Sequence, residues 1–129
     1  MDGFVVRGLD DLREVLTQGG ARMVLLTTPC LRPPKRGTAF DTGLPVMRDD
    51  ARVERLNAAW REYASLHPND VTLLDLSTFL CPNGKLRKQI DGEKVHTDGV
   101  HFSPAGARLF WNWLTPQIAD MRRQPSDSR

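Results

Sequence analysis

The densest cluster of reactive side-chain types lies in the run V-H-T-D-G-V-H-F-S-P, from Val95 to Pro104. Asp98 and His101 are separated by two residues, and Gly99 between them permits a tight turn. A carboxylate three residues before a histidine can fold back and accept a hydrogen bond from the ring's Nδ1–H. That bond fixes the tautomer, so that Nε2 is the atom that takes a proton from a nucleophile. The spacing therefore predicts a general base, His101, oriented by Asp98.

Two other interpretations of this run stay open on the residues alone. Asp-Gly is a common turn, and a single histidine in a loop is most often a surface residue. A metal site is the other alternative, since His96, Asp98 and His101 are all possible ligands. No fourth ligand follows at helpful spacing, although His67 could approach in space. We expect no metal and no organic cofactor.

Periodicity predicts the elements that position this run. The apolar residues recur at helical spacing in three segments and form short continuous runs in two others. Phe4-Val5-Val6 is compatible with the end of an earlier strand but is too short to decide. The expected helices cover residues 8–18, from Asp49 or Asp50 to before His67, and from the Ser103-Pro104 cap through Ile118; the expected strands cover residues 22–27 and 71–76.

The element order predicts an α/β protein whose parallel strands are joined by right-handed crossovers. Long loops are expected at residues 28–48 and 77–102, and the second holds an Asp91-Gly92 turn. Two parallel strands alone do not make a stable sheet, because both would be edges with unpaired backbone groups. Either further strands lie in the loops, or the chain is part of a larger fold. The second interpretation is favoured.

Composition bounds the class of protein. The chain has 129 residues, 40% of them hydrophobic, with a net charge of +2. These values indicate one globular domain and exclude a disordered chain or a nucleic-acid binder driven by bulk charge. No apolar run suits a membrane span, and the start lacks a secretory signal. Arg32, Lys35 and Arg36 could meet an anionic glycan, but a solvated loop is favoured. Residues 121–129 are expected to form a polar, disordered tail.

The stretch T-D-G-V-H-F-S-P-A-G-A-R, residues 97–108, resembles the last block of the SGNH (GDSL-type) hydrolases. The segments at residues 24–30, 56–60, 74–76 and 81–84 are similar to one branch of that family. In this branch the SGNH domain is fused behind membrane-bound acyltransferases that O-acylate bacterial surface polysaccharides. The resemblance covers roughly Leu9 to Ile118. It implies a three-layer, flavodoxin-like sheet, an extracytoplasmic location, His101 as catalytic base and Asp98 as the residue that orients it.

The family's nucleophilic serine lies in a G-D-S motif, which this sequence does not contain, and its G-x-N motif is also absent. Ser65, Ser77 and Ser103 do not match it. The resemblance therefore implies that residues 1–120 are the C-terminal part of an SGNH domain that lacks the first strands and is inactive alone. The intact enzyme would act on O-acyl esters, such as acetyl esters, of a cell-surface glycan or a small ester. The alternative is a non-catalytic binding module that associates with itself or with the missing half-domain.

Cys30 and Cys81 permit one disulfide or two thiols, and the residues alone favour neither. The resemblance changes this balance, because related domains face outside the membrane. Each cysteine also follows a strand at the same edge of the predicted sheet. We therefore expect a Cys30–Cys81 bond.

Overall fold

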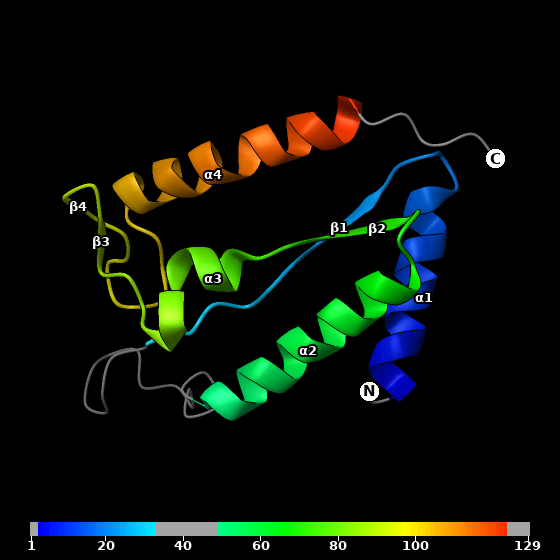
Figure 1. Cartoon of the computed structure of the whole chain (residues 1–129), viewed down its shortest axis with the longest axis horizontal. Coiled ribbons are helices and arrows are strands. Elements are labelled where there is room, and N and C mark those ends of the chain that lie inside the picture. Colours follow the sequence, from blue (N-terminus) through cyan, green and yellow to red (C-terminus); the bar gives the residue numbers. More distant parts are fainter. Residues whose placement is uncertain (1–2, 33–48, 124–129) are drawn as a thin grey trace.

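The computed structural model describes residues 3–32 and 49–123 of the chain. Figure 1 shows a mixed α/β arrangement in which helices flank a short pair of strands. The α/β class predicted from the element order is confirmed. The elements are α1 (Gly3–Thr17), β1 (Met23–Leu26), α2 (Asp50–Leu66), β2 (Val71–Leu74), α3 (Leu76–Leu80), the 3-10 turn η2 (Pro82–Gly84), β3 (Gln89–Ile90), β4 (Glu93–Lys94) and α4 (Pro104–Arg123).

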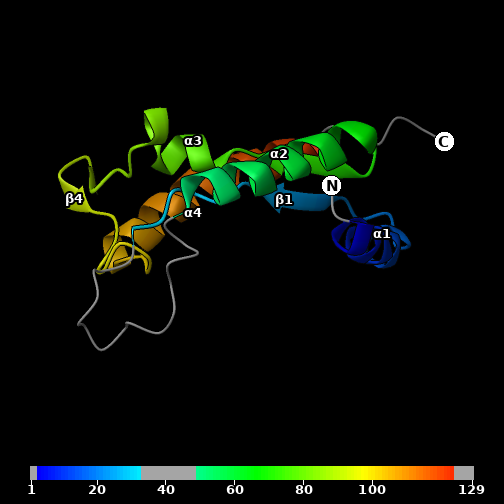
Figure 2. The same ribbon diagram turned by 90° about the horizontal axis from the view of Figure 1, so that it is seen from below.

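The central sheet is formed by β1 and β2, which pair in parallel from Met23↔Val71 to Leu26↔Leu74. Within the described residues it contains these two strands, and β3 and β4 form a separate antiparallel hairpin. Figures 1 and 2 together place α2 and α4 on opposite faces of the central pair. Because helices cover both faces of the strands, side chains that point to either face are apolar. A flavodoxin-like order of further strands remains a prediction.

Two expectations about element boundaries were wrong. The first helix begins at Gly3 and not near residue 8, so the run Phe4-Val5-Val6, which the sequence left undecided, lies in α1. The second strand ends at Leu74, because Asp75 caps a short helix where a strand and loop were expected. Its Oδ1 accepts a hydrogen bond from the Thr78 N–H at 3.0 Å, and its Oδ2 accepts one from the Thr78 hydroxyl at 2.7 Å. The 77–102 segment therefore holds a helix and a hairpin as well as loops.

Helix α2 has the predicted start and carries an unpredicted buried amide. Asp49 is its N-cap and accepts a hydrogen bond from the Arg52 N–H at 3.0 Å. Asn57 is fully buried in the middle of the helix. Its Oδ1 accepts from the Thr28 N–H at 2.7 Å, and its Nδ2 donates to the Thr28 C=O at 2.9 Å. This pair of bonds holds the chain where it leaves β1.

The apolar side chains form two clusters, one on each face of the central pair. On the face toward α1 and α2, Leu9, Met23, Tyr63 and Val71 are buried together. The predicted apolar stripe of α1 is only partly covered, since Val15 is 67% exposed in the described structure. The second cluster lies under α4 and contains Leu76, Leu80, Val95 and both cysteines.

The expected disulfide is present. Cys30 and Cys81 are bonded, with their Cα atoms 6.0 Å apart. The bond joins the segment after β1 to the segment after α3, and both cysteines are buried. It therefore links the two chain segments that leave the same end of the sheet.

Helix α4 extends further than expected. Pro104 is its first residue, as predicted, and the helix continues past residue 120 to Arg123. Residues 124–129 of the expected tail, and Lys35 and Arg36, lie outside the described residues. Within the described part of the chain, no helix has the length and apolar character needed to cross a membrane.

Replacing Asn57 by alanine should destabilise the fold. The change would leave the N–H and C=O groups of Thr28 without their partner, so we expect the free energy of unfolding to fall by about 2 kcal/mol. Urea unfolding followed by circular dichroism measures this loss. Arg55→Ala is the control, because Arg55 is exposed on the same helix. Equal stability of the two variants would contradict a stabilising role for the hydrogen bonds between Asn57 and Thr28.

Removing the disulfide by the double substitution Cys30→Ala and Cys81→Ala should lower the free energy of unfolding by about 2–4 kcal/mol. The reason is that the bond closes a loop with a sequence separation of 51 residues, which restricts the unfolded chain. Urea unfolding of both proteins measures the difference. Titration of the unfolded, unreduced chain should find no thiol. Two thiols per chain would contradict the bond.

Candidate active site

The candidate site lies on a tight loop between β4 and α4. His96 and Phe102 form an isolated antiparallel bridge, and the Thr97 N–H donates to the His101 C=O at 2.9 Å. The rings of His96 and Phe102 are stacked, with centroids 5.1 Å apart. These contacts close the loop at its base and place Asp98 and His101 close together at its tip.

The carboxylate of Asp98 folds back onto His101 in the manner expected from the spacing. Its Oδ2 lies 2.7 Å from His101 Nδ1. Its Oδ1 accepts backbone hydrogen bonds from Val100 at 3.0 Å and from His101 at 2.8 Å. The hydrogen bond from the His101 ring, followed by those from the two backbone N–H groups, lowers the pKa of Asp98 far below its ordinary value. Asp98 is therefore a carboxylate at neutral pH.

The two side chains of this pair differ in exposure. The Asp98 side chain is 21% exposed, while the His101 side chain is 68% exposed. The Asp98 carboxylate is fixed by its hydrogen bonds. The His101 ring that it orients lies at the surface of the described residues. Such an arrangement can present an imidazole of defined tautomer to a group brought from elsewhere.

Gly99 fastens the tip of the loop to the segment that follows β1. Its φ is 86°, and its C=O accepts a hydrogen bond from the Arg32 N–H at 2.9 Å. A Cβ at this position would lie 1.9 Å from the Arg32 carbonyl oxygen. Glycine is required here both by the backbone conformation and by the close approach.

Ser103 is the N-cap of α4, as the sequence predicted. Its hydroxyl accepts a hydrogen bond from the Gly106 N–H at 2.9 Å and donates to the Lys94 C=O. Gly106 packs closely enough on Val95 that a Cβ would lie 1.9 Å from the Val95 carbonyl oxygen. The T-D-G-V-H-F-S-P-A-G run thus specifies a loop and a helix start, and the hydroxyl of Ser103 serves the cap.

The other residues considered from the sequence lie on other elements. Ser65 is on α2, where its hydroxyl donates to the Glu62 C=O at 2.7 Å. Ser77 lies in the first turn of α3. His67 follows α2 and packs on the Tyr63 ring, with centroids 4.5 Å apart. In the described ranges, 3–32 and 49–123, no group of three or more His, Cys, Asp or Glu side chains is placed to hold a metal ion.

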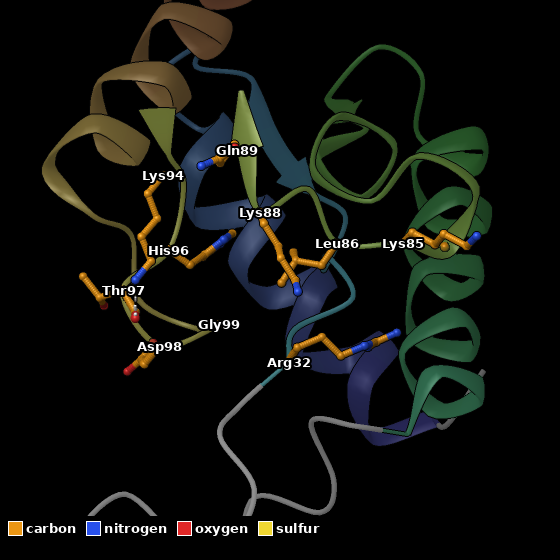
Figure 3. A pocket seen from close by; sticks show the side chains of 11 residues that line it. Arg32, Lys85, Leu86, Lys88, Gln89, Lys94, His96, Thr97, Asp98 and Gly99 are labelled. Carbon is orange, nitrogen blue, oxygen red and sulfur yellow. Dashed lines mark hydrogen bonds between the residues drawn. The ribbon is translucent and has the colours of Figure 1, made fainter. Parts of the chain in front are cut away.

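An open pocket of about 770 Å³ adjoins Asp98 (Figure 3). The sequence analysis named His96 only as a possible metal ligand. The structure places this residue in the wall of the pocket. His96 is 5% exposed, and burial lowers the pKa of its ring, although the Asp98 charge opposes this shift. The lining residues are Arg32, Gly84, Lys85, Leu86, Lys88, Gln89, Lys94, His96, Thr97, Asp98 and Gly99.

The described residues form a mixed α/β protein with a parallel pair of strands. The Asp98–His101 pair lies on the loop between β4 and α4. Residues 5–114 match the family model "SGNH domain (fused to AT3 domains)", and the chain belongs to this family. The resemblance seen in the sequence is thereby confirmed. Neither the comparison with curated proteins nor that with solved structures gives a match.

The Asp98 carboxyl should titrate well below its ordinary pKa of 3.8. The fold stabilises the ionised form, so this contribution to stability is complete above pH 3.8 and is lost as the pH falls through the folded-state value. The ¹³C shift of the Asp98 carboxyl carbon, followed with pH, measures the midpoint. His101→Ala should move the midpoint upward, since it removes the largest cause. An ordinary midpoint in the unmodified chain would contradict the geometry.

Proposed function

We propose that this chain supplies the acid–base pair of an SGNH-type ester hydrolase or O-acyltransferase. Asp98 orients His101, and His101 moves the proton. The observation that carries this proposal is the 2.7 Å contact between Asp98 Oδ2 and His101 Nδ1 on an exposed loop. A hydrogen bond at Nδ1 leaves Nε2 as the basic atom of the neutral ring. Membership of the SGNH domain family supports the reaction class.

The proposed reaction begins when a hydroxyl group attacks the carbonyl carbon of an ester and its proton passes to His101 Nε2. The resulting oxyanion collapses, the bond to the leaving alcohol breaks, and the imidazolium returns its proton to that alcohol. Water or a second alcohol then attacks the acyl group by the same steps, which gives hydrolysis or transfer. The Asp98 carboxylate stabilises the imidazolium during both transfers.

The substrate in this proposal is an O-acylated carbohydrate, with the acyl group an acetyl or similar group. The support is the family description, which links these domains to AT3 domains. We also propose a location outside the cytoplasmic membrane of a bacterium, which the resemblance of residues 97–108 implies. No step of the reaction requires a metal or an organic cofactor.

The loop that carries Asp98 and His101 does not provide the hydroxyl nucleophile that the proposed reaction needs. The 129 residues contain no G-D-S motif. Ser103 already serves as the cap of α4. We propose that the nucleophile comes from a polypeptide segment with a G-D-S motif that docks against the same end of the sheet. The isolated chain then carries a base without the group that it activates.

Turnover of 4-nitrophenyl acetate tests this division of roles. The chain alone should be no more active than free imidazole. Joined behind the G-D-S-bearing half of another SGNH domain, it should gain turnover, and His101→Ala should then lower kcat by about 10²–10⁴-fold. His67→Ala is the matched control, because it removes a histidine that is remote from the loop. Full activity of the His101→Ala protein would overturn the proposal.

Two further measurements on the chain alone keep the proposal testable if the joined protein does not fold. The ¹⁵N shifts of the neutral His101 ring should report a proton on Nδ1, and a proton on Nε2 would contradict the assigned role. Robust turnover by the chain alone, abolished by His101→Ala, would place the nucleophile within these residues. That result would overturn the claim that the nucleophile comes from another segment.

A further inference from the structure

The pocket beside Asp98 is lined by several cationic side chains. Four of its lining residues are cationic, and Asp98 is its one acidic residue. Lys85, Lys88 and Lys94 are the lysines within residues 3–32 and 49–123, and all three line this pocket. They come from the segment that leads into the candidate catalytic loop. The lysine side chains of the described residues are therefore concentrated beside the proposed reaction centre.

Two of these cations already have partners. Arg32 forms a two-point ion pair with Asp50, at 2.8 and 3.0 Å. Lys94 Nζ donates to the Thr97 C=O at 3.2 Å. Lys85 and Lys88 have no ion pair or side-chain hydrogen bond to the described residues. In Figure 3 the Lys88 side chain extends into the space that the His96 ring faces, whereas Lys85 extends away from it.

His96 supplies the second polar group of this space. The residue is 5% exposed, and its Nδ1 has no hydrogen-bond partner among the residues that the structure describes. A buried polar atom without a partner is costly, so native proteins almost always satisfy it. The ring stacks on Phe102, which fixes its plane. A ligand held between His96 and Lys88 would contact the side of this ring that faces the pocket.

Asp98 offsets part of the lysines' charge but forms no ion pair with them in the described structure. Its two oxygens accept three hydrogen bonds, from the His101 ring and from two backbone N–H groups. Both Asp98 oxygens therefore accept hydrogen bonds from residues of their own loop. The ammonium group of Lys88 is available to bind a ligand. Lysine and a histidine N–H both donate to anionic oxygens, and hydrogen bonds of this kind are the stronger ones.

We propose that this pocket binds the anionic group of a carbohydrate, a carboxylate or a phosphate ester, between Lys88 and His96. The inference rests on the proposed function, which it deepens by naming the substrate as an acidic sugar. The volume of about 770 Å³ lies within the range of ligand pockets and exceeds what a bare anion needs. The anionic group would anchor the sugar while its ester reaches His101.

Binding of galacturonate and of glucose 6-phosphate to the 129-residue chain tests the inference, with galactose and glucose as their uncharged counterparts. The His96 ring signals and the Lys88 amide signal, followed by NMR, report the dissociation constant. Both acidic sugars should shift these signals saturably. Lys88→Gln should raise the dissociation constant by about tenfold or more. Uncharged sugars that shift the same signals equally would overturn the proposal.

Arg87→Gln is the matched control. Arg87 lies between Lys85 and Lys88 in sequence, is exposed and carries the same charge, but does not line the pocket. This variant should change the dissociation constant by less than about twofold, as expected for a screened surface charge. An equal loss in Lys88→Gln and Arg87→Gln would show attraction by net charge and would overturn the site.

Two other arms separate the possible outcomes. Inorganic phosphate that binds as tightly as glucose 6-phosphate would overturn the assignment to a carbohydrate. His67→Ala should leave the dissociation constants unchanged, because His67 does not line the pocket. Binding is measured without turnover, so failure of the catalytic proposal and failure of this one give different results. His96→Phe, which keeps the stack on Phe102, should weaken binding in the same way as Lys88→Gln.

Discussion

The covalent bond between Cys30 and Cys81 is the constraint on which the site end of the molecule depends. The central sheet has two strands of four residues, which cannot by themselves fix the long segments that leave it. The disulfide ties those segments together below the loop. The backbone bond from Arg32 to Gly99 then carries the constraint to the loop tip. The position of the Asp–His pair follows from this chain of connections more than from the sheet.

Polar contacts around β1 and β2 serve the same end. Thr27 donates its hydroxyl to Asp75 at 2.9 Å and accepts the Ser77 N–H at 2.8 Å. Asn57 holds Thr28 from the opposite side of the chain. Each contact joins residues that are at least 29 positions apart in sequence. They satisfy polar groups where regular strand pairing ends.

The sequence was informative where a local rule decided the structure. The Ser103 cap, the Asp91-Gly92 turn and the contact of Asp98 with His101 all depend on residues a few positions apart. It was misleading for the start of α1 and for the end of β2. The short run Phe4-Val5-Val6 is compatible with both helix and strand, so the first helix was expected to begin too late. The second strand was expected to continue to residue 76, but Asp75 is the N-cap of α3. The burial of Asn57 could not be predicted, because its partner Thr28 is brought to it only by the tertiary fold. The same holds for the position of His96 under the pocket.

The pocket and the Asp–His pair share one loop, and this gives the proposed anion a second effect. In the reaction we propose, His101 becomes an imidazolium next to Asp98. Unscreened cations beside the loop would oppose that charge, and an anion bound at Lys88 would remove part of the opposition. Lys88 would then oppose the imidazolium less while the substrate occupies the pocket. The oxygens of Asp98 accept hydrogen bonds from their own loop and form no ion pair with Lys88, so its ammonium group stays available to the bound anion.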